Sequence, residues 1–150
     1  MLFTDKIRSC QFTGIVFFKK TIDGTSQICN QALVDKLKVI PSNYLKTLTQ
    51  DRGTENYNFQ TVENELKISC YFAHPYSSYE RGSNENLNGL FRRYFPKKTD
   101  FEKITNEEIK KVEYLINSRP RKRFGGLSPY EVFYHKTGVD LTPELVAIED

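Results

Sequence analysis

The sequence has no tryptophan and only three cysteines, Cys10, Cys29 and Cys70, which lie far apart. Because no CxxC pair is present, these cysteines do not indicate a zinc site or a redox motif, and reduced thiols are the expectation. No run approaches the roughly 20 apolar residues that cross a bilayer, and the N-terminus lacks the pattern of a signal peptide. The sequence therefore predicts a soluble, cytoplasmic protein without a membrane partner.

The 150 residues include 11 phenylalanines and 9 tyrosines, and the formal net charge is +3. This length suits one domain that buries its own core. The mildly basic balance permits a nucleic-acid partner but does not argue for one by itself. No repeat or flexible linker divides the chain, so we expect one domain at 1–137 and a tail at 138–150.

Strand-like and helix-like segments alternate along the chain. Apolar, aromatic and β-branched runs at 12–18, 44–49 and 68–72 predict short strands. Apolar residues at helical spacing predict a helix after Thr25 and Ser26, another at 56–66 and a third at about 80–94. This alternation favours an α/β fold in which helices pack on a sheet.

The C-terminal third is predicted to be helical, with two capping boxes. Thr105 precedes Glu108 by three positions, and Ser128 precedes Glu131 in the same way, with Pro129 at the first helical position. The stripes expected to face the core are Leu87, Leu90, Phe91 and Tyr94 in the helix at 80–94, and Ile109, Val112, Leu115 and Ile116 in the following helix.

Asp51 and Glu85 are the candidate chemical residues. Asp51 lies just past a predicted strand, and Glu85 lies on the helix that follows the next strand. If an α/β layer brings two carboxylates together, their repulsion favours a hard cation such as Mg²⁺ or Mn²⁺, and two such ions suit phosphoryl transfer. The spacing alone is equally typical of a turn aspartate and a solvated helix glutamate, and it does not decide between these readings.

The sequence around these two acids is more specific. Residues 48–55 read LTQDRGTE, residues 71–90 read YFAHPYSSYERGSNENLNGL, and residues 92–101 read RRYFPKKTDF. Further on, 117–122 read NSRPRK and 128–133 read SPYEVF. Together these segments strongly resemble transposases of the insertion sequence 30 family, and the resemblance runs from near residue 5 to residue 133.

The resemblance implies a ribonuclease H-like integrase core, a mixed sheet flanked by helices, whose Asp-Asp-Glu triad holds two Mg²⁺ or Mn²⁺ ions. By position, Asp51 would be the second acid and Glu85 the third, and both would be metal ligands. The residues expected near this site are His74, Asn84, Asn86 and Asn88. His74 alone is more typical of a turn or packing residue.

The resemblance also implies that the first strand and its aspartate lie upstream of the segment matched by 3–8. Asp5 is therefore not assigned as the first acid, and whether this chain is itself an enzyme stays open. A sheet without its first strand is expected to expose an apolar edge and to fold poorly alone.

Basic residues form two groups that are candidates for contact with DNA phosphates. They are Arg92, Arg93, Lys97 and Lys98, and then Arg119, Arg121, Lys122 and Arg123. A solvated basic face is the other interpretation, and the resemblance favours DNA, because Arg92 matches a basic residue placed two turns after the glutamate.

The function that the resemblance implies is that of a bacterial insertion-sequence transposase, which cleaves DNA and transfers strands between transposon ends and target. We expect a truncated, inactive copy. The alternative is a non-catalytic remnant that binds DNA or interferes with transposase by pairing with itself or with the full-length enzyme.

Overall fold

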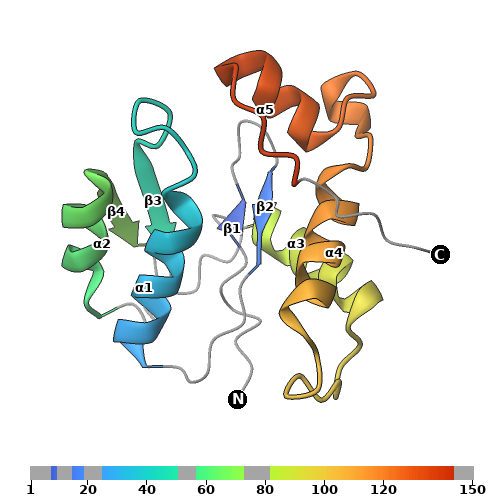
Figure 1. Cartoon of the computed structure of the whole chain (residues 1–150), viewed down its shortest axis with the longest axis horizontal. Coiled ribbons are helices and arrows are strands. Elements are labelled where there is room, and N and C mark those ends of the chain that lie inside the picture. The colour runs from blue at the N-terminus through green and yellow to red at the C-terminus, as the bar shows by residue number, and fades with distance from the viewer. Residues whose placement is uncertain (1–7, 10–14, 19–24, 51–56, 73–81, 144–150) are drawn as a thin grey trace.

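The structure is a computed structural model that describes residues 8–9, 15–18, 25–50, 57–72 and 82–143. Figure 1 shows the elements with strands near the centre and left and helices around them. In chain order they are β1 (Arg8–Ser9), β2 (Val16–Phe17), α1 (Ser26–Leu37), β3 (Thr47–Gln50), α2 (Phe59–Leu66), β4 (Ser69–Phe72), α3 (Gly82–Tyr94), α4 (Asn106–Asn117), a 3-10 helix (Lys122–Phe124) and α5 (Pro129–Thr137).

The described strands form two sheets of two strands each. β1 and β2 are antiparallel, with Arg8 opposite Phe17, whereas β3 and β4 are parallel, with Gln50 opposite Phe72. The predicted α/β alternation is confirmed in the order β3-α2-β4. In Figure 1, β3 and β1 are the inner strands of the two pairs, and among the described residues no strand pairing joins them.

The predicted helices are present, and the two predicted capping boxes begin α4 and α5. Thr25 precedes α1 as expected but makes no side-chain cap hydrogen bond. In α4 the Thr105 hydroxyl accepts a hydrogen bond from the Glu108 backbone N–H at 3.1 Å, and the Glu108 carboxylate accepts one from Thr105 N–H at 2.7 Å. Ser128 and Glu131 make the same reciprocal pair at the start of α5. Gly138 ends α5 with a φ of 71°, a left-handed conformation that glycine adopts without strain.

Two clusters of buried side chains hold these elements together. The first core lies between α1, α2, α5 and β3, and the second lies between β2, α3 and α4. The first core contains Ile15, Leu33, Val34, Leu37, Ile40, Leu48, Val62, Leu66, Ile68, Tyr130 and Phe133. The second core contains Val16, Phe18, Phe91, Phe95, Phe101, Ile109, Val112 and Ile116.

Side chains of α4 connect β2 and α1. The buried Asn117 amide accepts a hydrogen bond from Val16 N–H at 2.8 Å and donates one to the Val16 carbonyl at 2.7 Å. The Glu113 carboxylate accepts a hydrogen bond from Phe18 N–H and makes an ion pair with Lys36 on α1 at 3.0 Å. Because α1 belongs to the first core and α4 to the second, Glu113 links the two cores.

Two apolar positions differ from the predicted pattern, and two polar side chains are buried. Tyr94 and Leu115 were expected in buried stripes, but they are 41% and 40% exposed. They lie at the margins of helix faces whose centres, Phe91 and Ile116, are buried. The side chains of Asn30 and Gln50 are buried, and none of their amide atoms has a hydrogen-bond partner among the described residues.

The region after 137 continues the packing of the first core, because Val139 and Leu141 lie against it. The boundary at 137/138 stays a prediction. Among the residues the structure describes, no helix has the length and apolar character that a membrane span requires.

Candidate nucleic-acid interface and acidic site

The two predicted catalytic acids belong to segments that different cores hold in place. Asp51 itself lies outside the described residues, but it follows Gln50, the last residue of β3, whose Leu48 is in the first core. Glu85 falls within α3, whose Phe91 is in the second core, and nothing is described of the Glu85 side chain. The position of one acid relative to the other therefore depends on how the two cores are joined.

The residues predicted near this site are only partly described. His74 lies outside the described residues, and Asn84 belongs to α3 without a described side chain. Asn86 and Asn88 are exposed on α3. The described residues contain no group of three or more histidine, cysteine, aspartate or glutamate side chains that could hold a metal. Carboxylates are the donors that Mg²⁺ and Mn²⁺ prefer, so the chemistry of the pair Asp51 and Glu85 fits such an ion.

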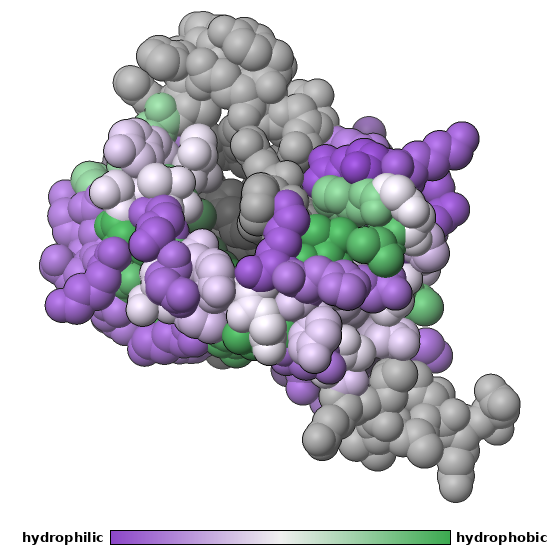
Figure 2. Space-filling view, turned by 90° about the horizontal axis from the view of Figure 1, so that it is seen from above, coloured by the Kyte–Doolittle hydropathy of each residue, from purple (hydrophilic) through white to green (hydrophobic). Residues whose placement is uncertain are grey.

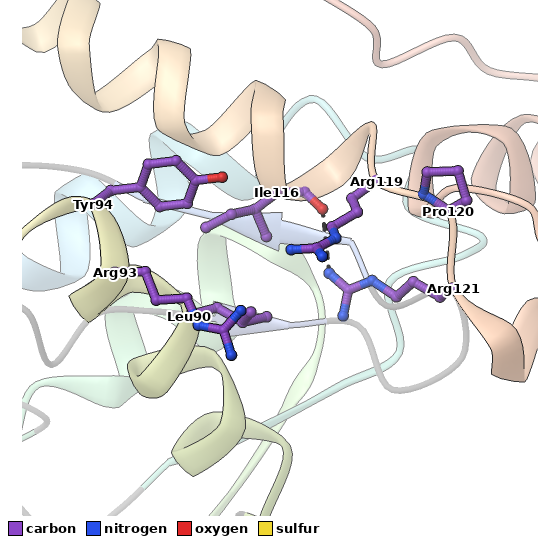
Figure 3. Close-up of a pocket in the computed structure, with 7 residues that line it drawn as sticks. All are labelled: Leu90, Arg93, Tyr94, Ile116, Arg119, Pro120 and Arg121. Atoms are coloured by element: carbon purple, nitrogen blue, oxygen red, sulfur yellow. Dashed lines mark hydrogen bonds between the residues drawn. The ribbon is translucent and has the colours of Figure 1, made fainter.

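The predicted basic residues all lie within 82–143, which the structure describes, and three of them line one pocket. The pocket has a volume of about 260 Å³ and lies between the end of α3 and the segment that follows α4. Figure 3 shows the guanidinium groups of Arg93, Arg119 and Arg121 directed into the same space. The lining residues are Leu90, Arg93, Tyr94, Ile116, Arg119, Pro120 and Arg121.

Arg121 is the fixed member of this group. Its guanidinium donates a hydrogen bond to the Ile116 carbonyl at 3.2 Å, near the end of α4 (Figure 3). Burial lowers the pKa of Arg121, and the positive charges of Arg123 and Arg119 lower it further. Since the ordinary pKa of arginine is above 12, Arg121 keeps its charge at neutral pH.

The pocket carries three positive charges, and the described residues supply no ion-pair partner for them. Within the described residues, the ion pairs join Lys36 to Glu113, Lys38 to Glu65 and Lys103 to Asp100, and none includes Arg93, Arg119 or Arg121. Three cations without an acidic partner repel one another unless an anion binds among them. The arrangement can therefore bind a phosphate or a carboxylate through charge-assisted hydrogen bonds.

The remaining basic residues extend this charge over the surface. Arg92 is half-buried, whereas Lys97 and Lys98 are exposed in the turn after α3. Lys122 and Arg123 are exposed on the 3-10 helix, and the Arg123 guanidinium carbon lies 4.4 Å from the ring centroid of Phe124. None of these five residues lines the pocket.

Comparisons with curated proteins identify the family, although no family model matches the chain. A transposase of insertion sequence element IS4351 from Bacteroides fragilis is 48% identical over 91 residues, 61% of this chain and 28% of that protein. Transposase InsI of element IS30A from Escherichia coli is 42% identical over 113 residues, 75% of this chain and 29% of that protein. The chain belongs to the insertion sequence 30 family of transposases.

A third transposase of this family, the probable transposase of element IS1161 from Streptococcus salivarius, is 36% identical over 115 residues. That match covers 77% of this chain and 32% of the relative. The chain thus spans about three tenths of the length of each of these transposases.

Solved structures confirm the predicted integrase-core fold of this family member. The catalytic core domain of BIV integrase superposes with a TM-score of 0.62 at 16% identity, covering 88% of this chain and 86% of that domain. A chain of the simian T-cell lymphotropic virus intasome in complex with PP2A regulatory subunit B56 gamma superposes with a TM-score of 0.70 at 16% identity, covering 96% of this chain and 50% of that one. At this identity the likeness establishes the fold alone.

The apolar lining of the pocket was not predicted as part of a site. Leu90, Tyr94 and Ile116 were assigned to the core, and the exposure of Tyr94 shows that one edge of that stripe reaches the surface. The sequence signal that could have indicated this part of the site is Tyr94, an aromatic residue directly after Arg92 and Arg93. On the face seen in Figure 2, most of the coloured residues are hydrophilic, and smaller apolar areas lie among them.

Proposed function

We propose that this chain is the part of an insertion sequence transposase that supplies the second and third catalytic acids and a surface for DNA. The reaction of the complete site is cleavage of a DNA strand and its transfer to target DNA. The observation that carries this proposal is the identity to transposase InsI, 42% over 113 residues. The integrase-core fold supports it independently of sequence.

Asp51 and Glu85 would hold a pair of divalent ions together with an aspartate from an upstream strand. When bound, Mg²⁺ or Mn²⁺ in such a pair activates a water or a 3′-hydroxyl and stabilises the leaving oxygen. The contribution of this chain is to fix the two carboxylates on segments that β3 and α3 position. Because a fixed geometry is required, a change in how the two cores meet would lower metal affinity as well as rate.

The basic residues would hold the DNA backbone beside this site. Lysine and arginine contacts to phosphates supply most sequence-independent affinity for DNA and make that affinity depend on salt. Arg93, Arg119 and Arg121 converge on one pocket, and Lys97, Lys98, Lys122 and Arg123 are exposed. The DNA of transposon ends and target is therefore the proposed partner.

The test uses Mn²⁺ titration and nicking of supercoiled plasmid. Asp51→Asn and Glu85→Gln should each weaken Mn²⁺ binding about tenfold or more, whereas the matched control Glu107→Gln, an exposed residue on α4, should not. Nicking should require an aspartate-bearing upstream strand joined from a relative, and both acid variants should abolish it. Equal Mn²⁺ affinity and nicking in wild type and both acid variants would overturn the assignment.

A second candidate function is a non-catalytic DNA-binding protein that interferes with intact transposase. The observation that favours it is that the basic pocket is complete without Asp51 or Glu85. Co-expression with a full-length relative should then lower its transposition frequency, and Asp51→Asn should not relieve that effect. A frequency unchanged by co-expression contradicts this alternative.

A further inference from the structure

The pocket between α3 and α4 combines a cationic side with an apolar side. Arg93 and Arg119 are exposed, and Arg121 is held by its hydrogen bond to Ile116. Opposite charge is absent from their described surroundings, because no ion pair reaches these three arginines. Guanidinium groups bind phosphate in a bidentate manner, and Arg121 is held in position before any ligand arrives. The cationic side therefore suits a phosphate group.

A phosphate alone would leave the rest of the pocket without a partner. Ile116 is 3% exposed and lies in the second core, and Leu90 packs against that core. Tyr94 adds an aromatic ring at the surface, and Pro120 completes an apolar wall. Aromatic and apolar side chains of this kind contact the faces of unstacked bases. The ligand that matches both sides carries a phosphate and a flat apolar ring.

We propose that this pocket binds a single unpaired nucleotide of a DNA strand, with its phosphate at Arg93, Arg119 and Arg121 and its base against Leu90, Tyr94 and Ile116. In duplex DNA each base is stacked between its neighbours, so only a single-stranded or splayed nucleotide can reach a pocket. The volume of about 260 Å³ suits one such unit. This inference rests on the proposed function, since it takes DNA as the partner.

The first experiment tests whether the pocket arginines bind a phosphate at the pocket or act only through the net positive charge of the chain. Affinity of the full chain for a 12-nucleotide single strand and for the same sequence as duplex is measured by fluorescence anisotropy across a salt series. The variant Arg93→Gln/Arg119→Gln is compared with Lys110→Gln/Lys111→Gln, which removes the same charge from exposed positions on α4. The first variant should lose at least tenfold in single-strand affinity and lower the salt slope by about 0.7, the value for the one phosphate contact that these arginines share. The control should lose less than threefold.

The second experiment tests the base side. Tyr94→Ala should lower single-strand affinity about 5- to 100-fold without changing the salt slope or the duplex affinity. Tyr134→Ala, an exposed tyrosine on α5, is the matched control and should have no effect. An oligonucleotide with abasic positions should bind wild type as weakly as intact strand binds Tyr94→Ala.

The outcomes distinguish this proposal from its rivals. Equal losses for single strand and duplex in the arginine variant, with no effect of Tyr94→Ala, would overturn it in favour of a phosphate-only surface. Arginine-dependent binding of a poly-glutamate peptide without any effect on DNA would overturn it in favour of an acidic protein partner. If Asp51→Asn and Glu85→Gln leave Mn²⁺ binding unchanged while Tyr94→Ala still selectively weakens single-strand binding, the catalytic assignment fails and the nucleotide pocket stands.

Discussion

The first and second cores differ in their side chains and in what they position. The first core is mostly aliphatic and holds β3, the strand that leads into Asp51. The second core contains four phenylalanines, holds α3 with Glu85, and provides Ile116 to the basic pocket. The acidic site would therefore be assembled from both cores, whereas Leu90 and Ile116, the pocket residues that pack in a core, both belong to the second core. A substitution that weakens the contact between the two cores should therefore lower the affinity for metal more than the affinity of the pocket for its ligand.

The largest expected effect is the loss of an aromatic centre in the second core. Phe91 lies within 4.8–6.1 Å, between ring centroids, of Phe18, Phe95 and Phe101. Phe91→Ala should lower the free energy of unfolding by about 3–5 kcal/mol, measured by urea denaturation. If the two cores form one cooperative unit, near-ultraviolet circular dichroism and tyrosine fluorescence should report the same transition. Separate transitions would show that the cores unfold independently.

The next effect concerns the contact between α4 and β2. Asn117→Ala would leave the buried N–H and carbonyl of Val16 without their hydrogen bonds. The expected loss is about 2–3 kcal/mol in the free energy of unfolding, because buried unpaired polar groups are destabilising. Asn64→Ala, an exposed asparagine on α2, is the control. A loss no larger than that of the control would mean that these bonds do not hold β2 in place.

The stability of the first core is expected to fall at high pH because this core contains Tyr130. The described buried residues of the second core include no tyrosine. Burial raises the pKa of Tyr130 to about 12, although a hydrogen bond with Asn117 acts in the opposite direction. Above pH 10 the unfolded chain releases this proton while the folded chain retains it, so stability falls between about pH 10 and 12. Between pH 9 and pH 12 the free energy of unfolding should decrease by about 2 kcal/mol less in Tyr130→Phe than in wild type, as measured from urea midpoints. An identical pH profile in the variant would contradict the assignment.

The smallest effect has the opposite sign. Gln50 is fully buried at the end of β3, and in the part of the chain that the structure describes neither of its amide atoms has a hydrogen-bond partner. Gln50→Leu keeps a side chain of similar size and should raise the free energy of unfolding by about 1 kcal/mol, seen as a higher melting temperature. Gln60→Leu, an exposed glutamine on α2, should leave it nearly unchanged. A lower melting temperature would indicate that the Gln50 amide makes a favourable contact in solution.

Local signals in the sequence predicted much of the fold. The two capping boxes were predicted because Thr105 and Ser128 act on residues three positions away. Burial of Gln50 and exposure of Tyr94 depend on elements distant in the chain, and residue type favoured the opposite in both cases. The convergence of Arg93 with Arg119 and Arg121 likewise depends on how α3 meets α4. For Asp51 and Glu85 the spacing was insufficient, and only the resemblance made an assignment possible.

The hydrogen bonds between Val16 and Asn117 join residues 101 positions apart. A ribosome that adds about 5–20 residues per second reaches Asn117 roughly 5–20 seconds after Val16. During that interval β2 emerges without the α4 side chain that satisfies its backbone. Until Asn117 is made, the Val16 backbone therefore lacks the side chain that hydrogen-bonds to it in the folded chain.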